Sequence, residues 1–494
     1  MEILLAFFVS WDSHKIKPDK MQRRKFIKNA AAASAAFSIV PSHVLGKTHV
    51  PPSDTLYVGA FGVGGRGNGV INGLNDTGRV KFVAFCDVDD RRAQQTYEQF
   101  PDVKRFKDFR KVFDAHLNDI DAIMVATPDH THATIALPFM REKKHAYVEK
   151  PLTHNIYEAR LMTQVAKENG IVTQMGNQGA SSDDSRIARE WVESGIIGKV
   201  HTIDCWTNRP VWPQGVPMPT KKDRIPKELD WDLWLGPAAM RDYNDAYLPF
   251  KWRGFWDFGT GALGDMGCHI METPFSVLDL GYPVEAEASC TTVWVDDFVE
   301  ADYSHSCPPS SKIHLKFDHE EHGEIALNWY DGGIKPNLPD ELKDGETIGD
   351  TGGGTVIYGD KGILVCDTYS RNARLLPSEM MDLYKAPAPK YPRVPGGMDG
   401  HIANFVDGCQ KGTPTSSNFE KAGKLTETVL MGNLAVKAYQ YKELQPGKKP
   451  TDWNPYNSPG RRKLKCDGEN MKITNYDKAN EWVTREYRKG WELK

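Results

Sequence analysis

The sequence lacks long apolar runs. No run reaches the roughly 18 residues that a membrane-spanning helix requires. Net charge is also small, at −4 over 494 residues, which argues against a protein that binds nucleic acid through a basic surface. The eight cysteines include no C-x-x-C pair, so we predict neither a zinc knuckle nor a redox dithiol and expect buried free thiols. A chain of this length should form two domains with additional segments.

One glycine-rich stretch dominates the N-terminal part. Residues 56–67 form an apolar run that is broken by glycines at the spacing G-x-G-x-x-G, and a second apolar run, 80–86, ends at Asp87. This order of strand, turn, helix, strand and acid is the fingerprint of a dinucleotide-binding domain. The carboxylate of Asp87 favours NAD over NADP, while Arg91 and Arg92 leave binding of a 2′-phosphate open. The expected cofactor contacts are Gly62, Gly64, Gly65, Arg66 and Gly67.

Strand and helix patterns alternate from residue 54 to residue 176, which predicts a parallel sheet with helices on both faces. The expected strands are 56–61, 80–86, 120–126, 145–149 and 171–175. Helices are expected near 67–75, 90–99, 107–117, 131–143 and 154–169. Ligands of such sheets bind beyond the carboxyl ends of the strands, so the loops at these ends carry the functional prediction.

Two of these loops hold polar side chains. His130 and His132 could supply half of a metal site, but no thiol or acid cluster accompanies them at ligand spacing. We therefore predict no metal and expect these histidines to cap the next helix or line the cofactor cleft. In the second loop, Glu149-Lys150-Pro151, the lysine follows a buried strand where a nicotinamide would lie. A surface salt bridge between Lys150 and Glu149 is the competing interpretation.

A tryptophan-rich stretch, 207–257, lies within the second half of the chain. Seven of the 13 tryptophans fall between residues 191 and 256. Because aromatic faces stack on the C–H faces of sugar rings and charged groups bind the hydroxyls, this stretch favours a carbohydrate substrate. The alternative is that most of these rings form the core of a loop-rich insertion. The predicted substrate contacts are Trp206, Arg253, Trp256 and Asp265.

Asp265 and His269 follow this stretch four residues apart, so on a helix they share one face. Histidine has a pKa near neutrality, as a general base for alcohol oxidation requires, and a neighbouring carboxylate can orient the alcohol. A helix-capping aspartate and a core histidine are the structural alternative. Gly352-Gly-Gly354 is not followed by Lys-Ser/Thr, so we interpret it as a turn entering a strand.

The glycine turn, Asp87, the segment Ala126-Thr127-Pro128-x-x-Thr131-His132 and Glu149-Lys150-Pro151 together resemble the Gfo/Idh/MocA oxidoreductases. The resemblance implies an α/β fold, with a Rossmann domain over 54–176 and a C-terminal α+β domain over 177–494 that carries a large, open, mostly antiparallel sheet. This sheet pairs subunits in some relatives, so a homo-oligomer is expected. Implied cofactor contacts are Thr127, Pro128, His132, Glu149 and Lys150; implied catalytic residues are Lys150, Asp265 and His269.

The N-terminus carries paired arginines, Arg23 and Arg24, before a weakly apolar, Ala-rich segment. We interpret residues 21–46 as a twin-arginine signal peptide and residues 1–20 as an extension or a mis-assigned start. The protein is then expected in the periplasm or exported. An ordinary basic, Ala-rich helix is the alternative.

The leading hypothesis from the sequence is an exported NAD(P)-dependent oxidoreductase that acts on a hydroxyl of a carbohydrate or polyol and holds its cofactor tightly. The second is an NAD-dependent glycosidase, in which oxidation, elimination and re-reduction follow one another on a retained cofactor. The third is a non-catalytic sugar-binding protein. The expected partner is a small carbohydrate, with no nucleic acid and no membrane span.

Overall fold

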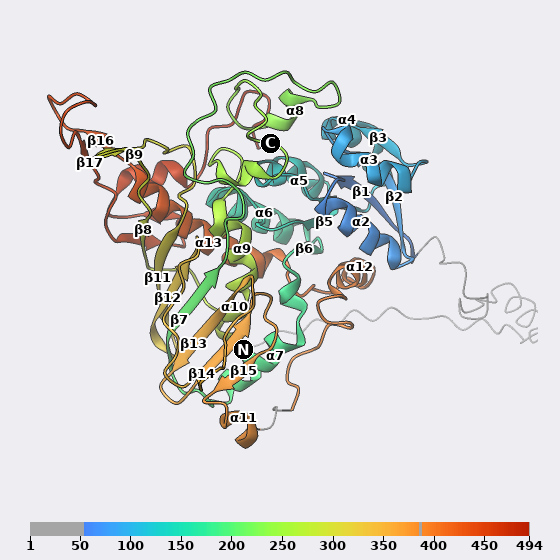
Figure 1. Ribbon diagram of the computed structural model, residues 1–494. Coiled ribbons are helices and arrows are strands. Elements are labelled where there is room, and N and C mark those ends of the chain that lie inside the picture. Colours follow the sequence, from blue (N-terminus) through green and yellow to red (C-terminus); the bar gives the residue numbers. More distant parts are fainter. Residues whose placement is uncertain (1–53, 385–387, 494) are drawn as a thin grey trace, which may run out of the picture. The chain divides into compact units, whose positions relative to one another are not determined.

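The computed structural model describes residues 54–384 and 388–493. The predicted extension and signal peptide, residues 1–46, lie outside this part of the chain. Two sheets organise the described residues, and helices pack between them (Figure 1). Within these residues no helix is both long and apolar enough to cross a membrane.

The first sheet has six strands, all parallel, in the order β3-β2-β1-β4-β5-β6. The strands are β1 (Leu56–Phe61), β2 (Val80–Cys86), β3 (Lys104–Phe106), β4 (Ala122–Val125), β5 (His145–Val148) and β6 (Thr173–Met175). The crossover helices are α2 (Arg66–Asp76), α3 (Asp90–Gln99), α4 (Phe109–His116), α5 (His132–Arg141) and α6 (Ile156–Asn169). This confirms the predicted parallel domain. Strand β3 was not predicted, because it is only three residues long and mostly exposed.

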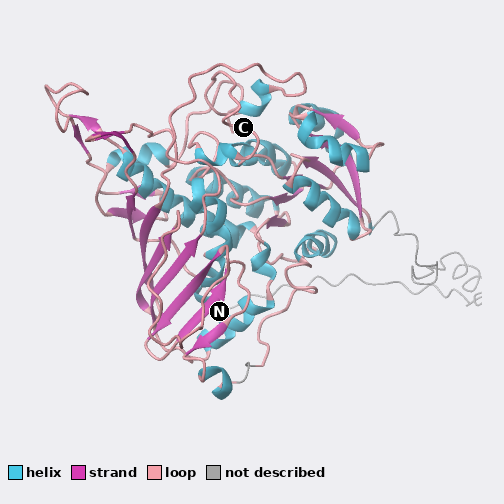
Figure 2. Ribbon diagram, in the orientation of Figure 1, coloured by secondary structure: helices cyan, strands magenta, loops and turns pink. Residues whose placement is uncertain are grey.

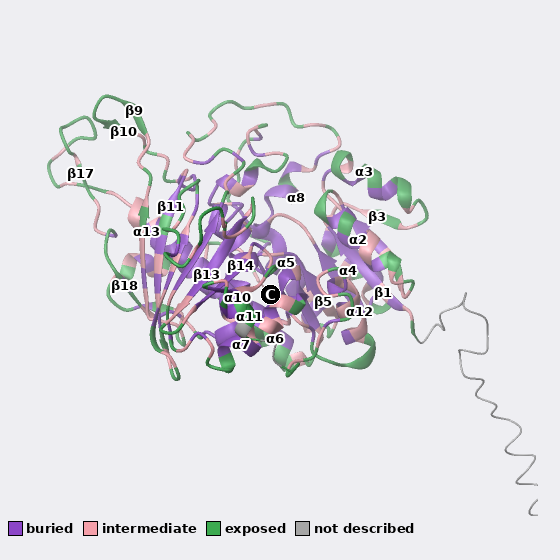
Figure 3. Ribbon diagram, turned by 60° about the horizontal axis from the view of Figure 1, so that its bottom comes forward, coloured by how far each residue is buried: buried purple, intermediate pink, exposed green. Residues whose placement is uncertain are grey.

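The second sheet has nine strands in the order β15-β14-β13-β7-β12-β11-β8-β18-β19 and is antiparallel except where β12 pairs with β7. The strands are β7 (Val200–Thr207), β8 (Glu285–Cys290), β11 (Ser311–His319), β12 (Gly323–Tyr330), β13 (Gly353–Gly359), β14 (Ile363–Asp367), β15 (Arg374–Leu376), β18 (Leu464–Asp467) and β19 (Lys472–Ile473). Its central strands are largely buried (Figure 3). The predicted open, mostly antiparallel sheet is confirmed.

Helices of the second half link the two sheets. They are α7 (Asp183–Glu193), α9 (Gly261–Ile270), α10 (Glu272–Leu278), α12 (His401–Lys411) and α13 (Phe419–Gln440). The long helix α13 packs against α6 of the first domain and against α9, β8 and β11. Because α9 carries Asp265 and His269, this packing fixes both residues relative to the parallel sheet.

The stretch 207–257 connects β7 to α9 and is mostly loop (Figure 2). Its one α-helix is the short α8 (Trp231–Leu235), and a 3-10 turn covers Lys251–Gly254. Small peripheral elements complete the described chain: β9 (Trp294–Asp296), β10 (Val299–Glu300), α11 (Met380–Leu383), β16 (Glu443–Leu444) and β17 (Tyr456–Asn457).

Candidate active site

A cavity of about 1050 Å³ opens at the carboxyl edge of the parallel sheet. Its walls come from the turn after β1, the loops after β2, β4 and β5, helix α9, the stretch 207–257 and the C-terminal segment. The predicted site residues that line it are Gly62, Gly64, Gly65, Arg66, Asp87, Thr127, Pro128, Glu149, Lys150, Arg253 and His269. Residues that are far apart in the sequence therefore share one chamber.

The glycine turn leaves no room for side chains. Gly62 has a φ of 74°, and a Cβ on Gly67 would lie 1.9 Å from the carbonyl oxygen of Gly62. A Cβ on Gly64 would lie 2.4 Å from the carbonyl oxygen of Arg92, so the absence of a side chain here also allows helix α3 to pack close to the turn. No side chain caps the N-terminus of α2, where the helix dipole favours an anion, although the N–H of Gly67 already donates to the carbonyl oxygen of Gly64 at 3.0 Å. The turn fits the pyrophosphate of a dinucleotide.

Asp87 lies at the end of β2, next to the glycine turn. One carboxylate oxygen accepts hydrogen bonds from the N–H groups of Val63 and Gly64 at 2.9 and 3.3 Å, and the other accepts one from Asp89 at 3.0 Å. Burial raises the pKa of Asp87 to about 6, against the effect of these hydrogen bonds, so the carboxylate is ionised at neutral pH. Arg91 forms an ion pair with Asp89 at 2.7 Å. A negative charge thus sits where an adenosine ribose would bind.

Replacing Asp87 with serine should lower the affinity for NAD relative to NADP by about tenfold or more, because the carboxylate binds ribose hydroxyls and repels a 2′-phosphate. Titration calorimetry with each dinucleotide measures the ratio. Asp90→Ser, which removes a carboxylate paired with Lys107 at 3.0 Å, is the matched control. An unchanged ratio in Asp87→Ser would contradict the assignment.

Glu149 joins the loop after β5 to the start of α2. Its side chain is nearly fully buried and accepts a hydrogen bond from Arg66 Nε at 2.7 Å. The second carboxylate oxygen lies 3.3 Å from the backbone N–H of Lys150. A Cβ on Gly176 would lie 2.5 Å from this carboxyl group, so the pocket around it is tight. Glu149 holds Arg66 at the glycine turn and is not paired with the ammonium of Lys150.

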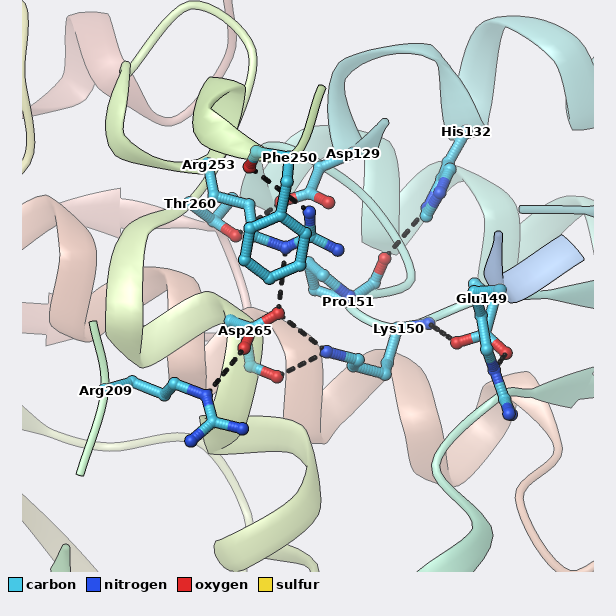
Figure 4. A network of polar contacts seen from close by, with 11 residues as sticks. Asp129, His132, Glu149, Lys150, Pro151, Arg209, Phe250, Arg253, Thr260 and Asp265 are labelled. Carbon is cyan, nitrogen blue, oxygen red and sulfur yellow. Dashed lines mark hydrogen bonds and ion pairs between the residues drawn. The ribbon is translucent and has the colours of Figure 1, made fainter. Parts of the chain in front are cut away.

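Lys150 points toward α9 of the other domain (Figure 4). Its Nζ donates to the backbone oxygen of Asp265 at 2.6 Å and to Asp265 Oδ1 at 3.0 Å. Arg253 Nε donates to the same Oδ1 at 3.1 Å, and Arg209 Nε lies 3.9 Å from Oδ2. Burial favours a raised pKa, but the positive charges of Lys150 and Arg253 prevail and lower the pKa of Asp265 to about 2. Asp265 is therefore a permanent anion that anchors the lysine.

His269 lies one turn after Asp265 on α9 and lines the cavity. Its ring meets the ring of Tyr369 edge-on at a centroid distance of 4.8 Å. Burial, with the nearby charge of Lys150, holds the pKa of His269 well below its ordinary value. The imidazole is thus neutral at physiological pH. A neutral imidazole beside a lysine ammonium can accept a proton from a hydroxyl group that the lysine polarises.

Two histidines of the β4 loop have backbone partners. The ring nitrogens of His132 lie 3.0 and 2.8 Å from the carbonyl oxygens of Pro151 and Thr127, which ties the two loops together. His130 Nε2 lies 3.0 Å from the carbonyl oxygen of Trp234. Neither ring lines the cavity, so the structure does not bring His132 to the predicted cofactor contact. Among residues 54–384 and 388–493 no cluster of three His, Cys, Asp or Glu side chains is arranged for a metal.

Three of the four predicted substrate contacts, Trp206, Trp256 and Asp265, are not among the residues that line the cavity. Trp206 is 3% exposed and packs against β13, where a Cβ on Gly354 would lie 2.7 Å from its ring. Trp256 is also buried, and its indole N–H donates to Gln440 at 3.1 Å. These rings belong to the core, as the alternative interpretation held. The aromatic residues that do line the cavity and were not singled out as contacts are Phe61, Phe109, Trp234, Tyr243, Phe250, Trp252, Tyr369 and Trp491.

Trp206→Ala should therefore act on stability and leave substrate affinity unchanged in the folded fraction. Removing a buried tryptophan costs roughly 3–5 kcal/mol of unfolding free energy. Denaturant titration measures this loss, and the KM of the remaining folded enzyme tests the second part. The exposed Trp453, with 77% of its surface accessible, gives a control variant, Trp453→Ala, with little effect on either quantity. A rise in KM for Trp206→Ala that Trp453→Ala does not show would indicate that Trp206 contacts the substrate after all.

The parallel domain, its glycine turn and the bonded pair of Lys150 and Asp265, with His269 one helical turn further on, define a protein of the NAD-binding oxidoreductase class. Residues 56–177 match the profile described as an oxidoreductase family with an NAD-binding Rossmann fold, and residues 188–301 match the profile of that family's C-terminal alpha/beta domain. The chain belongs to this family, the Gfo/Idh/MocA oxidoreductases. The resemblance seen in the sequence is confirmed, and so is NAD as the cofactor type.

Individual relatives are more distant. A glycosyl hydrolase family 109 protein of Shewanella pealeana is 28% identical over 207 residues, which are 37% of this chain and 44% of the relative. Myo-inositol 2-dehydrogenase of Thermotoga maritima is 25% identical over 188 residues, 38% of this chain and 54% of the relative. The chain thus spans about half the length of these curated relatives.

Among solved structures, a levoglucosan dehydrogenase in complex with NADH superimposes with a TM-score of 0.53 at 17% identity. The match covers 78% of this chain and 98% of that one. A WlbA dehydrogenase of Chromobacterium violaceum in complex with NADH and UDP-GlcNAcA gives a TM-score of 0.54 at 13% identity, over 78% and 94% of the two chains. At these identities the likeness shows a shared fold.

Proposed function

We propose that the protein is an NAD(H)-dependent dehydrogenase that oxidises a hydroxyl group of a carbohydrate or polyol. One observation carries the proposal: Lys150 from the first domain and His269 from the second line the same cavity as the glycine turn. Two relatives are named as a myo-inositol 2-dehydrogenase and a levoglucosan dehydrogenase, which supports this substrate class. The aromatic residues on the cavity wall, Trp234, Phe250 and Trp252, offer flat apolar surface to a sugar ring.

In the proposed reaction each of these residues has its own role. Bound NAD supplies a hydride acceptor; Gly64, Gly65 and Arg66 would hold its pyrophosphate, and Asp87 its adenosine ribose. Lys150, anchored by Asp265, presents its ammonium group to the substrate oxygen and stabilises the negative charge that develops there. His269 removes the hydroxyl proton. Arg253, bonded to Asp265 and lining the cavity, is positioned to bind a neighbouring hydroxyl.

A second candidate is cleavage of a glycosidic bond on a retained cofactor. It is favoured by the relatives named as glycosyl hydrolase family 109 proteins. Oxidation at one sugar carbon acidifies the neighbouring C–H, and the same lysine and histidine can then assist loss of the glycosidic oxygen. Water then adds to the double bond that this loss creates, and re-reduction of the carbonyl completes a cycle with no net change in the cofactor.

Product analysis separates the two candidates. The purified protein is incubated with a panel of free sugars and polyols plus NAD, and separately with chromogenic aryl glycosides without added NAD. Net formation of NADH with a keto sugar supports the dehydrogenase. Release of the chromogenic alcohol without added cofactor supports glycoside cleavage. Sugar-dependent thermal stabilisation with neither product would point to a binding protein and against both proposals.

We also propose that the protein is exported by the twin-arginine pathway, on the basis of Arg23, Arg24 and the apolar segment that follows them. Replacing both arginines with lysine should retain the protein in the cytoplasm, as cell fractionation with an unrelated periplasmic marker would measure. Unchanged export of the variant would contradict the signal. A homo-oligomer through the nine-stranded sheet remains a proposal that light scattering can test.

A further inference from the structure

The end of the cavity beyond Asp87 is closed by residues from outside the parallel domain. On the side of that domain lie Lys107, Asp108 and Phe109, which follow β3. Facing them are Leu233 and Trp234 of α8, together with Trp491 near the C-terminus. In a dinucleotide fold the pyrophosphate lies on the glycine turn and the adenosine ribose on the acid after β2, so the adenine lies at this end.

The backbone just before helix α8 is hydrogen-bonded to the loops after β2 and β3. The N–H of Asp230 donates to the carbonyl oxygen of Val88 at 2.9 Å, and the N–H of Asp90 donates to that of Glu228 at 3.3 Å. Lys107 Nζ donates to the same carbonyl of Glu228 at 2.5 Å. The loops after β2 and β3 are thereby joined directly to the stretch 207–257.

The C-terminal segment is in turn bound to α8. Arg488 Nε donates to the carbonyl oxygen of Gly236 at 2.9 Å, and its Nη2 donates to that of Asp232 at 2.8 Å (α8 and the C-terminus are marked in Figure 1). Upstream, the Tyr487 hydroxyl donates to buried Glu158 of α6 at 2.8 Å. These contacts hold the segment against both domains.

Trp491 is the part of this segment that faces the cavity. Its ring centroid lies 6.1 Å from that of Phe109, and the guanidinium carbon of Arg110 lies 4.6 Å from its ring. Only 7% of the residue is exposed. Trp491 also lies outside both segments that match the family profiles. An aromatic plane is thus held at the adenine end by the last part of the chain.

We propose that α8 and residues 488–491 are a part of the dinucleotide site, in which Trp491 covers the adenine and slows cofactor release. This rests on the proposed function only in taking a dinucleotide as the ligand. Base–aromatic contacts contribute substantially to nucleotide binding, and the cover adds a barrier because Arg488 must part from α8 before the adenosine can leave. The nicotinamide end, at Lys150, lies on the other side of the glycine turn and is not touched by this cover.

The test uses the full-length protein stripped of nucleotide and probes each half of the cofactor separately. Trp491→Leu should weaken binding of NAD and of ADP by about tenfold and speed NADH release by a similar factor, while binding of nicotinamide mononucleotide is unchanged. Arg488→Gln, which removes the hydrogen bonds to α8 and the contact of the guanidinium carbon with the Trp491 ring at 5.4 Å, should speed NADH release in the same direction. Trp453→Leu, an exposed tryptophan in the same part of the sequence, is the matched control.

Wild-type affinity for ADP in Trp491→Leu, together with unchanged NADH release in Arg488→Gln, would overturn the proposal. So would an equal loss of affinity for nicotinamide mononucleotide, which would indicate a general structural effect. If Trp491→Leu does not fold, the NADH release rate of Arg488→Gln decides. This test does not depend on the sugar reaction. If the wild type turned over no sugar and Trp491→Leu still lost affinity for ADP, the proposed dehydrogenase activity would be refuted and this inference would stand.

Discussion

Replacing Lys150 with methionine should lower kcat by roughly 10²–10³ or more with little change in NAD affinity. The ammonium group donates two hydrogen bonds to Asp265, and Lys150 lines the cavity in which the substrate oxygen is proposed to bind. Methionine keeps the length and apolar stem but cannot stabilise an alkoxide. Steady-state kinetics with the preferred sugar measures the loss, and fluorescence titration with NADH shows that the cofactor site is intact.

Lys167→Met is a suitable control, since Lys167 is exposed on α6 in the same domain and should tolerate the change. Turnover within a few fold of wild type in Lys150→Met would remove the lysine from the mechanism. It would also remove the central support for an oxidoreductase that works through this cavity.

His269→Asn should lower kcat/KM by roughly 10²–10⁴, the contribution expected of a general base. Asparagine approximates the shape of the ring near Cβ and cannot accept a proton at neutral pH. His201→Asn, a change at an exposed position of β7, should have no effect. Near-normal kcat/KM in His269→Asn would leave His269 as a core residue packed on Tyr369.

The dependence of activity on pH is a second test of His269. Because the pKa of His269 is lowered well below 6.5, the base stays unprotonated as the pH falls through 6.5. Activity of the wild type should hold through that value and decline only at lower pH, whereas an unshifted histidine would lose half its activity there. The residual activity of His269→Asn should lack this acid limb. A wild-type midpoint at or above 6.5 would contradict the assigned environment.

Much of the first domain could be predicted because its signals are local. The glycine spacing gives the turn between β1 and α2, and the strands β1 and β2 match the apolar runs 56–61 and 80–86 in full. Strand β3 could not be found, since Lys104-Arg105-Phe106 has no apolar pattern and pairs only because β2 lies beside it. Asp265 and His269 were placed on one helical face by their spacing, which α9 shows.

The choice among aromatic residues required the fold. Trp206 and Trp234 lie in the same Trp-rich region, yet Trp206 faces β13 whereas Trp234 lines the cavity. Composition cannot separate them, because the difference lies in which surface each ring meets. The same holds for His132, whose ring nitrogens are taken by carbonyl groups of two loops. The sequence did not indicate a role for Trp491, because no motif near it relates it to the glycine turn.

The position of Trp491 has a consequence for how the protein is made. The cavity joins Gly62, near the start of the described residues, to Trp491, near their end. During translation the parallel domain emerges early, but this wall of the chamber does not exist until the ribosome has passed codon 491. Loading with a dinucleotide in the finished geometry therefore waits until Trp491 has left the ribosome, and a chain that terminates before this residue would present an open chamber.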